Sequence, residues 1–163
     1  MLFRSVLVLA FALAVASVFG QKNLPSVDVK KLDGQTVNIA DFGKLGKPVV
    51  ISFWATWCSP CKKELDAINE EYKEWHEKYG VEIVAISVDD ARSAAKVKAT
   101  VEQKGWPFTI LLDSNQDFQH AMNIESVPHS FLLNAKGEIV WEHNGYTPGD
   151  EAELEEKIAE LKK

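Results

Sequence analysis

Residues 48–68 read PVVISFWATWCSPCKKELDAI and carry the strongest structural signal in this 163-residue sequence. The first part, 48–55, is uncharged and rich in β-branched and aromatic residues, as is typical of a buried strand. The last part, 62–68, contains good helix formers. Both cysteines of the chain, Cys58 and Cys61, lie between these parts. The stretch therefore predicts a strand–turn–helix unit with a Cys-x-x-Cys pair at the turn.

This position gives the two sulfurs different surroundings. A cysteine at a helix start lies beside free backbone N–H groups and the positive end of the helix dipole, which both favour the thiolate. The second sulfur follows about one helical turn later, close enough for a disulfide. We therefore expect thiol–disulfide exchange, with Cys58 as the attacking thiolate and Cys61 as the resolving thiol. Pro60 fits the first helical turn, where its missing N–H is not needed.

Other uses of the two cysteines explain the pattern less well. A purely structural disulfide would close a very short loop and so remove little entropy from the unfolded chain. A structural zinc site needs four ligands, and the sequence has no second Cys-x-x-Cys and no His-x-x-x-His pair. A metal-binding chaperone that holds copper or zinc through both cysteines stays open as an alternative. The histidines available to it are His76, His120, His129 and His143.

Residues 1–20 predict a secretory signal peptide. Arg4 supplies a positive charge, and 5–19 is apolar or small throughout. This run is shorter than the roughly 20 residues of a comfortable membrane span, although an uncleaved N-terminal anchor is an alternative. Export, to the periplasm, places the cysteines where disulfides persist. An exported chain with a single Cys-x-x-Cys uses its thiols for chemistry.

The chain that follows this segment is acidic. The whole sequence has 24 acidic and 18 basic residues, and Arg4 is the only charged residue in 1–20. Without that segment the count is 24 against 17, a formal charge of −7. This balance argues against nucleic acid and anionic membrane surfaces as partners.

The pattern along the chain predicts strands that alternate with helices, then a hairpin and a closing helix. Such an order indicates an α/β fold with a central mixed sheet covered by helices on both faces. The expected strands are 27–29, 36–39, 48–54, 81–88, 109–112, 130–133 and 138–142. The expected helices are 59–79, 91–104, 116–122 and a last one that Thr147-Pro148 caps, with loops elsewhere, including 43–48.

Two motifs in this order resemble the thioredoxin superfamily. The run from Phe53 to Cys61, FWATWCSPC, looks like the thioredoxin active-site segment, and Val127-Pro128 resembles the cis-proline of the family. The N-terminal hairpin and the insertion at 91–107 are similar to the exported TlpA/ResA-like branch. The resemblance implies a thioredoxin-like fold over residues 25–163, with an added N-terminal β-hairpin.

The same resemblance implies a function. Members of this branch are exported oxidoreductases that reduce protein disulfides without a cofactor, and a membrane thiol donor recharges them. We accordingly expect a monomeric reductase of protein disulfides, with oxidase or isomerase activity as the alternative. Trp57, Ser59 and Pro60 would support the cysteines. Val127, before a cis Pro128, would expose its backbone for pairing with a substrate strand.

Several positions depart from the family pattern. Ser52 stands where cytoplasmic thioredoxins carry a buried Asp, and Ala85 stands where they carry its Lys partner. The family's proton acceptor for Cys61 is therefore missing at that place. Ser59 replaces a Glu found in some ResA-like proteins, which argues against a specific role in cytochrome maturation. His129 directly follows Pro128, and we expect its side chain to point away from the sulfurs.

Overall fold

A seven-stranded mixed sheet forms the centre of the computed structural model, which describes residues 23–162. The predicted signal peptide, 1–20, lies outside these residues. The strand order is β2-β1-β5-β4-β3-β6-β7. The strands are β1 (Asp28–Lys31), β2 (Thr36–Asn38), β3 (Val49–Trp54), β4 (Glu82–Ser87), β5 (Thr109–Leu112), β6 (His129–Leu133) and β7 (Ile139–Asn144). The helices are η1 (Ile39–Lys44), α1 (Ser59–Tyr79), η2 (Ala91–Ser93), α2 (Ala94–Lys104), α3 (Asp117–Ala121) and α4 (Asp150–Glu160).

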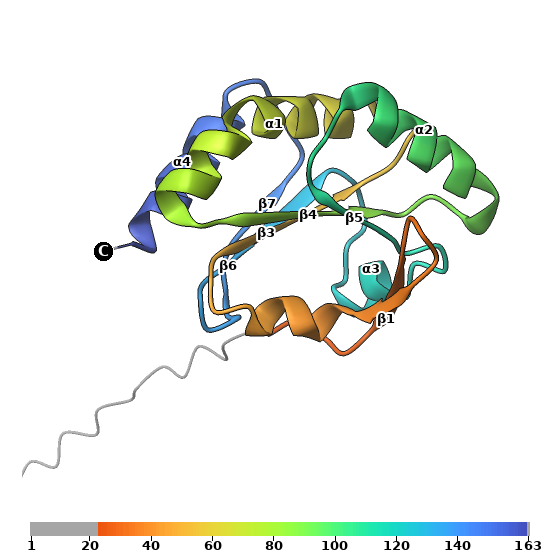
Figure 1. Ribbon diagram of the computed structural model, residues 1–163, viewed down its shortest axis with the longest axis horizontal. Coiled ribbons are helices and arrows are strands. Elements are labelled where there is room, and N and C mark those ends of the chain that lie inside the picture. The colour runs from red at the N-terminus through yellow and green to blue at the C-terminus, as the bar shows by residue number, and fades with distance from the viewer. Residues whose placement is uncertain (1–22, 163) are drawn as a thin grey trace, which may run out of the picture.

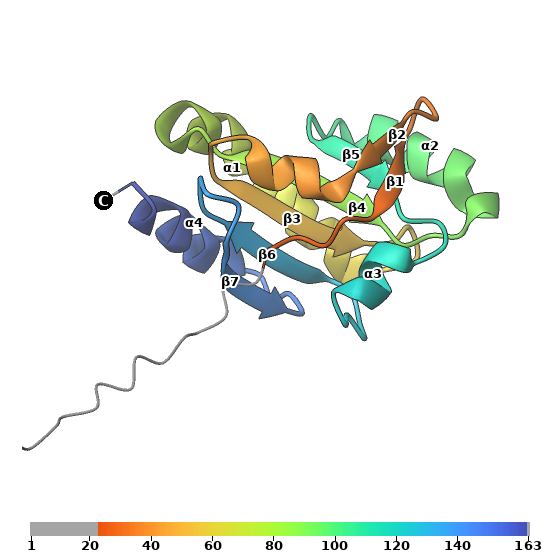
Figure 2. The ribbon, with the colours of Figure 1, turned by 90° about the horizontal axis from the view of Figure 1, so that it is seen from below.

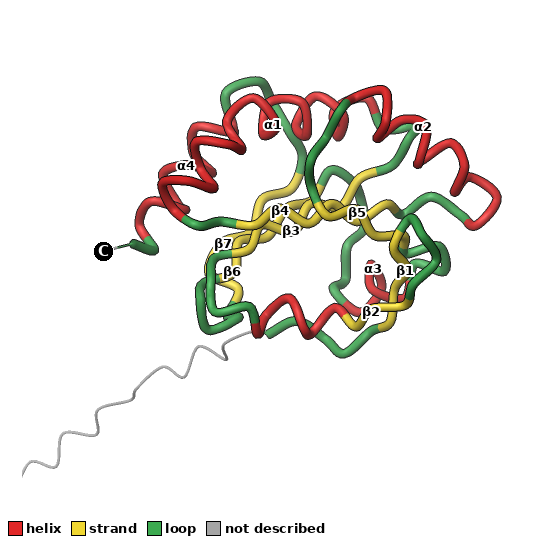
Figure 3. The backbone as a smooth tube through the Cα atoms, viewed as in Figure 1, coloured by secondary structure: helices red, strands yellow, loops and turns green. Residues whose placement is uncertain are grey.

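Helices cover both faces of the sheet, as the sequence pattern predicted. Strands β3, β4 and β5 are parallel neighbours joined through α1 and α2. Right-handed crossovers between successive parallel strands place both connecting helices on one face. Figures 1 and 3 show α1, α2 and α4 on that face and η1 with α3 on the other, and Figure 2 shows the second face from below. None of the described helices combines the length and apolar character needed to cross a membrane.

The expected N-terminal hairpin is present, and it extends the sheet at one edge. Strands β1 and β2 pair antiparallel, and β1 also pairs antiparallel with β5. The 3₁₀ helix η1 that follows was not predicted; the sequence pattern indicated strand to Ile39 and a loop at 43–48. The strand ends one residue earlier because the side chain of Asn38 accepts a hydrogen bond from the backbone N–H of Ala40 and so caps η1.

The central strand β3 is buried along its whole length, because it lies between β4 and β6 in the sheet and between the two layers of helices. It leads directly into α1, whose bounds match the expected 59–79. The helix ends at Gly80, which adopts φ = 70° and donates its N–H to the carbonyl of His76. This strand–helix unit holds the cysteine pair just beyond the carboxyl end of β3.

The start of the last helix differs from the expectation. Gly149, and not Thr147-Pro148, is the residue before α4, with φ = 112°. Such a positive φ is accessible to glycine and strained for other residues, so the chain turns there. The carboxylate of Asp150 accepts the backbone N–H of Thr147 at 2.7 Å and closes the turn.

Candidate active site

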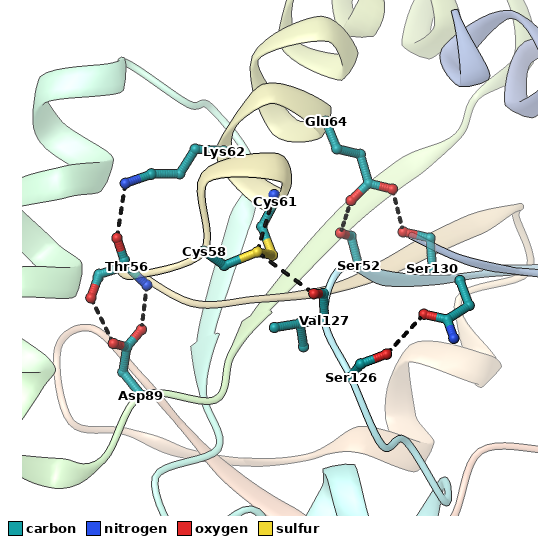
Figure 4. The surroundings of a disulfide bond; sticks show 11 residues. Ser52, Thr56, Cys58, Cys61, Lys62, Glu64, Asp89, Ser126, Val127 and Ser130 are labelled. Atoms are coloured by element: carbon teal, nitrogen blue, oxygen red, sulfur yellow. Dashed lines mark hydrogen bonds between the residues drawn. A yellow bond between two sulfur atoms is a disulfide. The ribbon is translucent and has the colours of Figure 1, made fainter. Parts of the chain in front are cut away.

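Cys58 and Cys61 form a disulfide where β3 passes into α1 (Figure 4). Cys58 is the N-cap of α1, and its Sγ accepts the backbone N–H of Cys61 at 3.2 Å. Cys58 is 5% exposed and Cys61 is completely buried. The first sulfur therefore lies at the helix start and nearer to solvent, in the surroundings that stabilise a thiolate.

The neighbours of the two cysteines in the sequence lie at the surface. Ser59 and Pro60 are exposed in the first turn of α1, and Trp57 is 67% exposed. An indole with this exposure contributes little to the core. The indole therefore forms part of the protein surface beside Cys58.

The expected cis peptide bond is confirmed between Val127 and Pro128. The carbonyl oxygen of Val127 lies 3.7 Å from Cys58 Sγ, as Figure 4 shows. Pro128 is buried and Val127 is half-buried. Two segments 69 residues apart in the chain thus meet at the more exposed sulfur.

A buried carboxylate holds the loop before the cysteines. Asp89 is 4% exposed and accepts hydrogen bonds from the backbone N–H of Thr56 at 2.8 Å and from its hydroxyl at 2.7 Å. The hydroxyl of Ser87 donates a third bond at 2.9 Å. Lys62 in turn donates to the carbonyl of Thr56 (Figure 4). Sequence reasoning missed Asp89, which follows the end of β4 and carries no motif of its own.

We expect Asp89→Ala to destabilise the protein by about 3 kcal/mol, because each buried donor left without an acceptor costs about 1–3 kcal/mol. Urea unfolding of the oxidised protein measures the change. The matched control is Asp90→Ala, since the exposed Asp90 caps the short helix η2 and pairs with Arg92 at the surface, so its loss should cost much less stability. An equal decrease in the free energy of unfolding for the two variants would contradict the role assigned to Asp89.

A second buried carboxylate lies on the other side of the cysteines. Glu64 is 5% exposed, and its two carboxylate oxygens accept the hydroxyls of Ser52 at 3.0 Å and Ser130 at 2.8 Å (Figure 4). Burial raises the pKa of Glu64 from 4.5 to about 7, although both hydroxyls act in the opposite direction. Glu64 follows Cys61 by three residues on α1, so the two side chains share one face of the helix.

Glu64 provides the carboxyl group that sequence analysis found missing at Ser52. Ser52 pairs with Ala85 on one side and Ser130 on the other. The acidic group reaches this place from the helix above the sheet and not from the strand. A signal was available: Glu64 lies three residues after Cys61 and four before Ile68, on the stripe that forms the buried face of α1.

His129 points away from the sulfurs, as expected. Its neighbour Ser130 contacts Glu64 on the α1 face, and successive residues of a strand point to opposite faces. On the other face, His129 stacks on Phe131, and its Nε2 lies 2.8 Å from a carboxylate oxygen of Glu142. Among the described residues, no group of three or more His, Cys, Asp or Glu side chains is arranged to hold a metal ion.

Residues 21–142 match a sequence model of the AhpC/TSA family. The chain is 37% identical over 119 residues to the thiol-disulfide oxidoreductase ResA of Bacillus thuringiensis strain Al Hakam, covering 73% of this chain and 66% of that protein. The ResA of Bacillus subtilis is 32% identical over 124 residues, which cover 76% of this chain and 66% of the relative. The chain therefore spans about two thirds of the length of these relatives.

Solved structures with a similar fold include proteins of the same kind as these relatives. A thioredoxin-like protein from Porphyromonas gingivalis matches with a TM-score of 0.77 and 46% identity, over 85% of this chain and 90% of that one. A protein from Chlorobium tepidum, provisionally named as thiol:disulfide interchange protein DsbE, matches with a TM-score of 0.76 and 25% identity, over 86% and 96%. The fold expected from the sequence is confirmed.

Proposed function

The chain belongs to the AhpC/TSA family, its described part is a thioredoxin-like thiol–disulfide oxidoreductase, and from this premise we propose that it reduces disulfides of exported proteins. The observation that carries the proposal is the unequal setting of the two sulfurs. Cys58 Sγ lies at the start of α1 beside the Cys61 N–H and the Val127 carbonyl, whereas Cys61 is fully buried. These different settings support a role for Cys58 in attacking the substrate and for Cys61 in resolving the complex.

The reaction starts from the dithiol. The Cys58 thiolate attacks one sulfur of the substrate disulfide, a mixed disulfide forms, and the other substrate sulfur leaves as a thiolate. The exposed ring of Trp57 and the backbone of Val127 next to Pro128 hold the substrate segment, and Ser59 and Pro60 complete the helix start. Cys61 then attacks Cys58 Sγ and releases the reduced substrate.

Cys61 must lose a proton before it attacks, and Glu64 is the group that accepts it. A fully buried thiol does not ionise readily, because burial disfavours the thiolate. The raised pKa of Glu64, about 7, lets this carboxylate both take and release a proton near neutral pH. Glu64 thus performs from α1 the task that a strand Asp performs in cytoplasmic thioredoxins.

Export and recharging complete the proposal. Residues 1–20 act as a signal peptide or an anchor and direct the thioredoxin-like domain, 25–163, to the periplasm. A reductase in an oxidising compartment needs a source of electrons, which a membrane thiol protein supplies to the monomeric domain.

The direction of electron flow follows from the reduction potential of the Cys58–Cys61 couple. We expect a value nearer to that of thioredoxin, about −270 mV, than to that of the oxidase DsbA, about −120 mV. Equilibration with glutathione or dithiothreitol buffers, followed by thiol counting, measures it. A potential above about −180 mV, the range of protein disulfide isomerase, would identify an oxidase or isomerase instead.

A further inference from the structure

Three polar side chains form a row across the sheet beneath α1. Ser52 of β3 pairs with Ser130 of β6, and Ser130 pairs with His143 of β7. Directly paired residues of neighbouring strands point to the same face and lie about 5 Å apart. Ser52 and Ser130 donate to Glu64 on that face, so His143 is the third member of this row. The row begins in the buried centre of the sheet and ends at its edge strand.

The last member of the row has contact with solvent and with a second acid. His143 Nε2 lies 3.2 Å from Asp150 Oδ2, and the side chains are 28% and 32% exposed. The same Asp150 is held by the turn before α4, through the N–H of Thr147. The AhpC/TSA match ends at residue 142, so His143 and α4 lie beyond the part of the chain that the family describes.

A small cavity connects Glu64 with this pair. Its volume is about 10 Å³, roughly what one water molecule needs. Its polar side chains offer several hydrogen-bond partners to such a water. The cavity is lined by Glu64, Ile68, Trp141, His143, Tyr146, Asp150, Glu151 and Leu154.

We propose that His143, oriented by Asp150, passes protons between the buried Glu64 and solvent. This inference rests on the proposed function, in which Glu64 takes the proton of Cys61. Cys61 Sγ–H gives its proton to Glu64, a bond forms between Cys61 and Cys58, and the bond from Cys58 to the substrate sulfur breaks, with the electron pair leaving on that sulfur. The proton then moves from Glu64 through the cavity to one ring nitrogen of His143. The second ring nitrogen of His143 releases a proton to solvent.

The charged groups around Glu64 are consistent with such a route. His143 lowers the pKa of Glu64 and Asp150 raises it, so both groups interact with the buried carboxyl electrostatically. The elements β3 and β6 contribute only the neutral hydroxyls of Ser52 and Ser130. The other ionisable side chains that line the cavity from α4 and the loop before it are Glu151 and Tyr146. The Tyr146 hydroxyl donates a hydrogen bond of 2.8 Å to the Glu151 carboxylate. Burial and this bond raise the pKa of Tyr146, which keeps its phenol protonated.

The test uses the variant His143→Gln with glutathione disulfide as the probe. Stopped-flow tryptophan fluorescence at saturating probe follows the release step, in which Cys61 attacks the mixed disulfide. In weak buffer we expect release to be about tenfold slower, a small part of the roughly 10²–10⁴-fold that general acid–base catalysis contributes. Added imidazole should restore the rate, because a free imidazole can replace the missing one. Cys58 attack, measured at low probe concentration, should stay unchanged.

Two further variants sharpen the result. His120→Gln, the same change at an exposed site on α3, should leave both steps unchanged. Asp150→Asn keeps the imidazole but removes its carboxylate partner, so it should slow release by a smaller factor. A normal rate for His143→Gln in weak buffer, or a slow rate that imidazole does not restore, would refute the route.

The variant Glu64→Gln separates this proposal from the one it rests on. If Glu64→Gln released substrate slowly and His143→Gln released it normally, the route through His143 would be refuted and the role of Glu64 would stand. Normal release by both variants would remove Glu64 from the reaction. If the wild-type dithiol failed to react with glutathione disulfide at all, the proposed function itself would be wrong.

Discussion

Cys58→Ser should abolish the acceleration that the protein gives to insulin reduction by dithiothreitol, whereas Cys61→Ser should accumulate a mixed disulfide with the substrate. The reason is the division of labour between the sulfurs: without Cys58 nothing attacks the substrate, and without Cys61 nothing resolves the complex. Turbidity from the insulin chains measures reduction. Mass spectrometry of the acid-quenched reaction detects the trapped adduct through the added mass of the bound insulin.

The double variant Cys58→Ser/Cys61→Ser serves as the control and should give the uncatalysed rate with no adduct. The trapping experiment is asymmetric, because Cys58 lies at the helix start with 5% exposure and Cys61 is completely buried. An adduct on Cys61 in Cys58→Ser, with none on Cys58 in Cys61→Ser, would reverse the assigned roles.

Glu64→Gln should remove about 3 kcal/mol of pH dependence from the stability of the oxidised protein. Burial raises the pKa of Glu64 from 4.5 to about 7, and each unit corresponds to about 1.4 kcal/mol. Between these two values the folded protein keeps a proton that the unfolded chain releases, so the free energy of unfolding falls as the pH rises. Below pH 4.5 the contribution is fully present, and above pH 7 it is lost.

Urea unfolding at pH 4.5 and pH 8 measures this effect in the wild type and in the variant. The amide that replaces the carboxyl group in the variant does not titrate. One of the two hydroxyls of Ser52 and Ser130 can turn to accept its N–H, while the other still donates to its oxygen. Glu70→Gln, on an exposed position of α1, is the matched control and should keep the wild-type pH dependence. A wild-type profile retained by Glu64→Gln would contradict the raised pKa.

Two buried acidic side chains, Asp89 and Glu64, lie on either side of the cysteine pair. Asp89 accepts three hydrogen bonds and holds the loop at Thr56 just before the cysteines. Glu64 accepts two hydroxyls and lies one helical turn beyond Cys61. The first acid therefore positions the loop before the cysteines, while the second, in the proposed function, takes the proton of the buried sulfur.

The local parts of this site could be read directly from the amino-acid order. Neighbouring residues alone specify the buried strand and the helix that follows it, with Pro60 in its first turn and Gly80 at its end. The observed bounds of α1 agree with the expected 59–79. The same holds for the N-terminal hairpin, whose turn and strands lie close together in the chain. The cis bond before Pro128 was predicted from the thioredoxin resemblance and not from local physics.

The parts that escaped prediction depend on residues far apart in the chain. Glu64 meets Ser52 and Ser130 across 12 and 66 residues, and Asp89 meets Thr56 across 33. Nothing in local propensity specifies such pairs, because they exist only once α1 has packed on the sheet and β6 has paired with β3. A buried carboxylate acquires its pKa from the groups that surround it, and those groups are brought together by folding. The cysteine motif is therefore a property of the sequence, whereas the proton chemistry around it is a property of the tertiary structure.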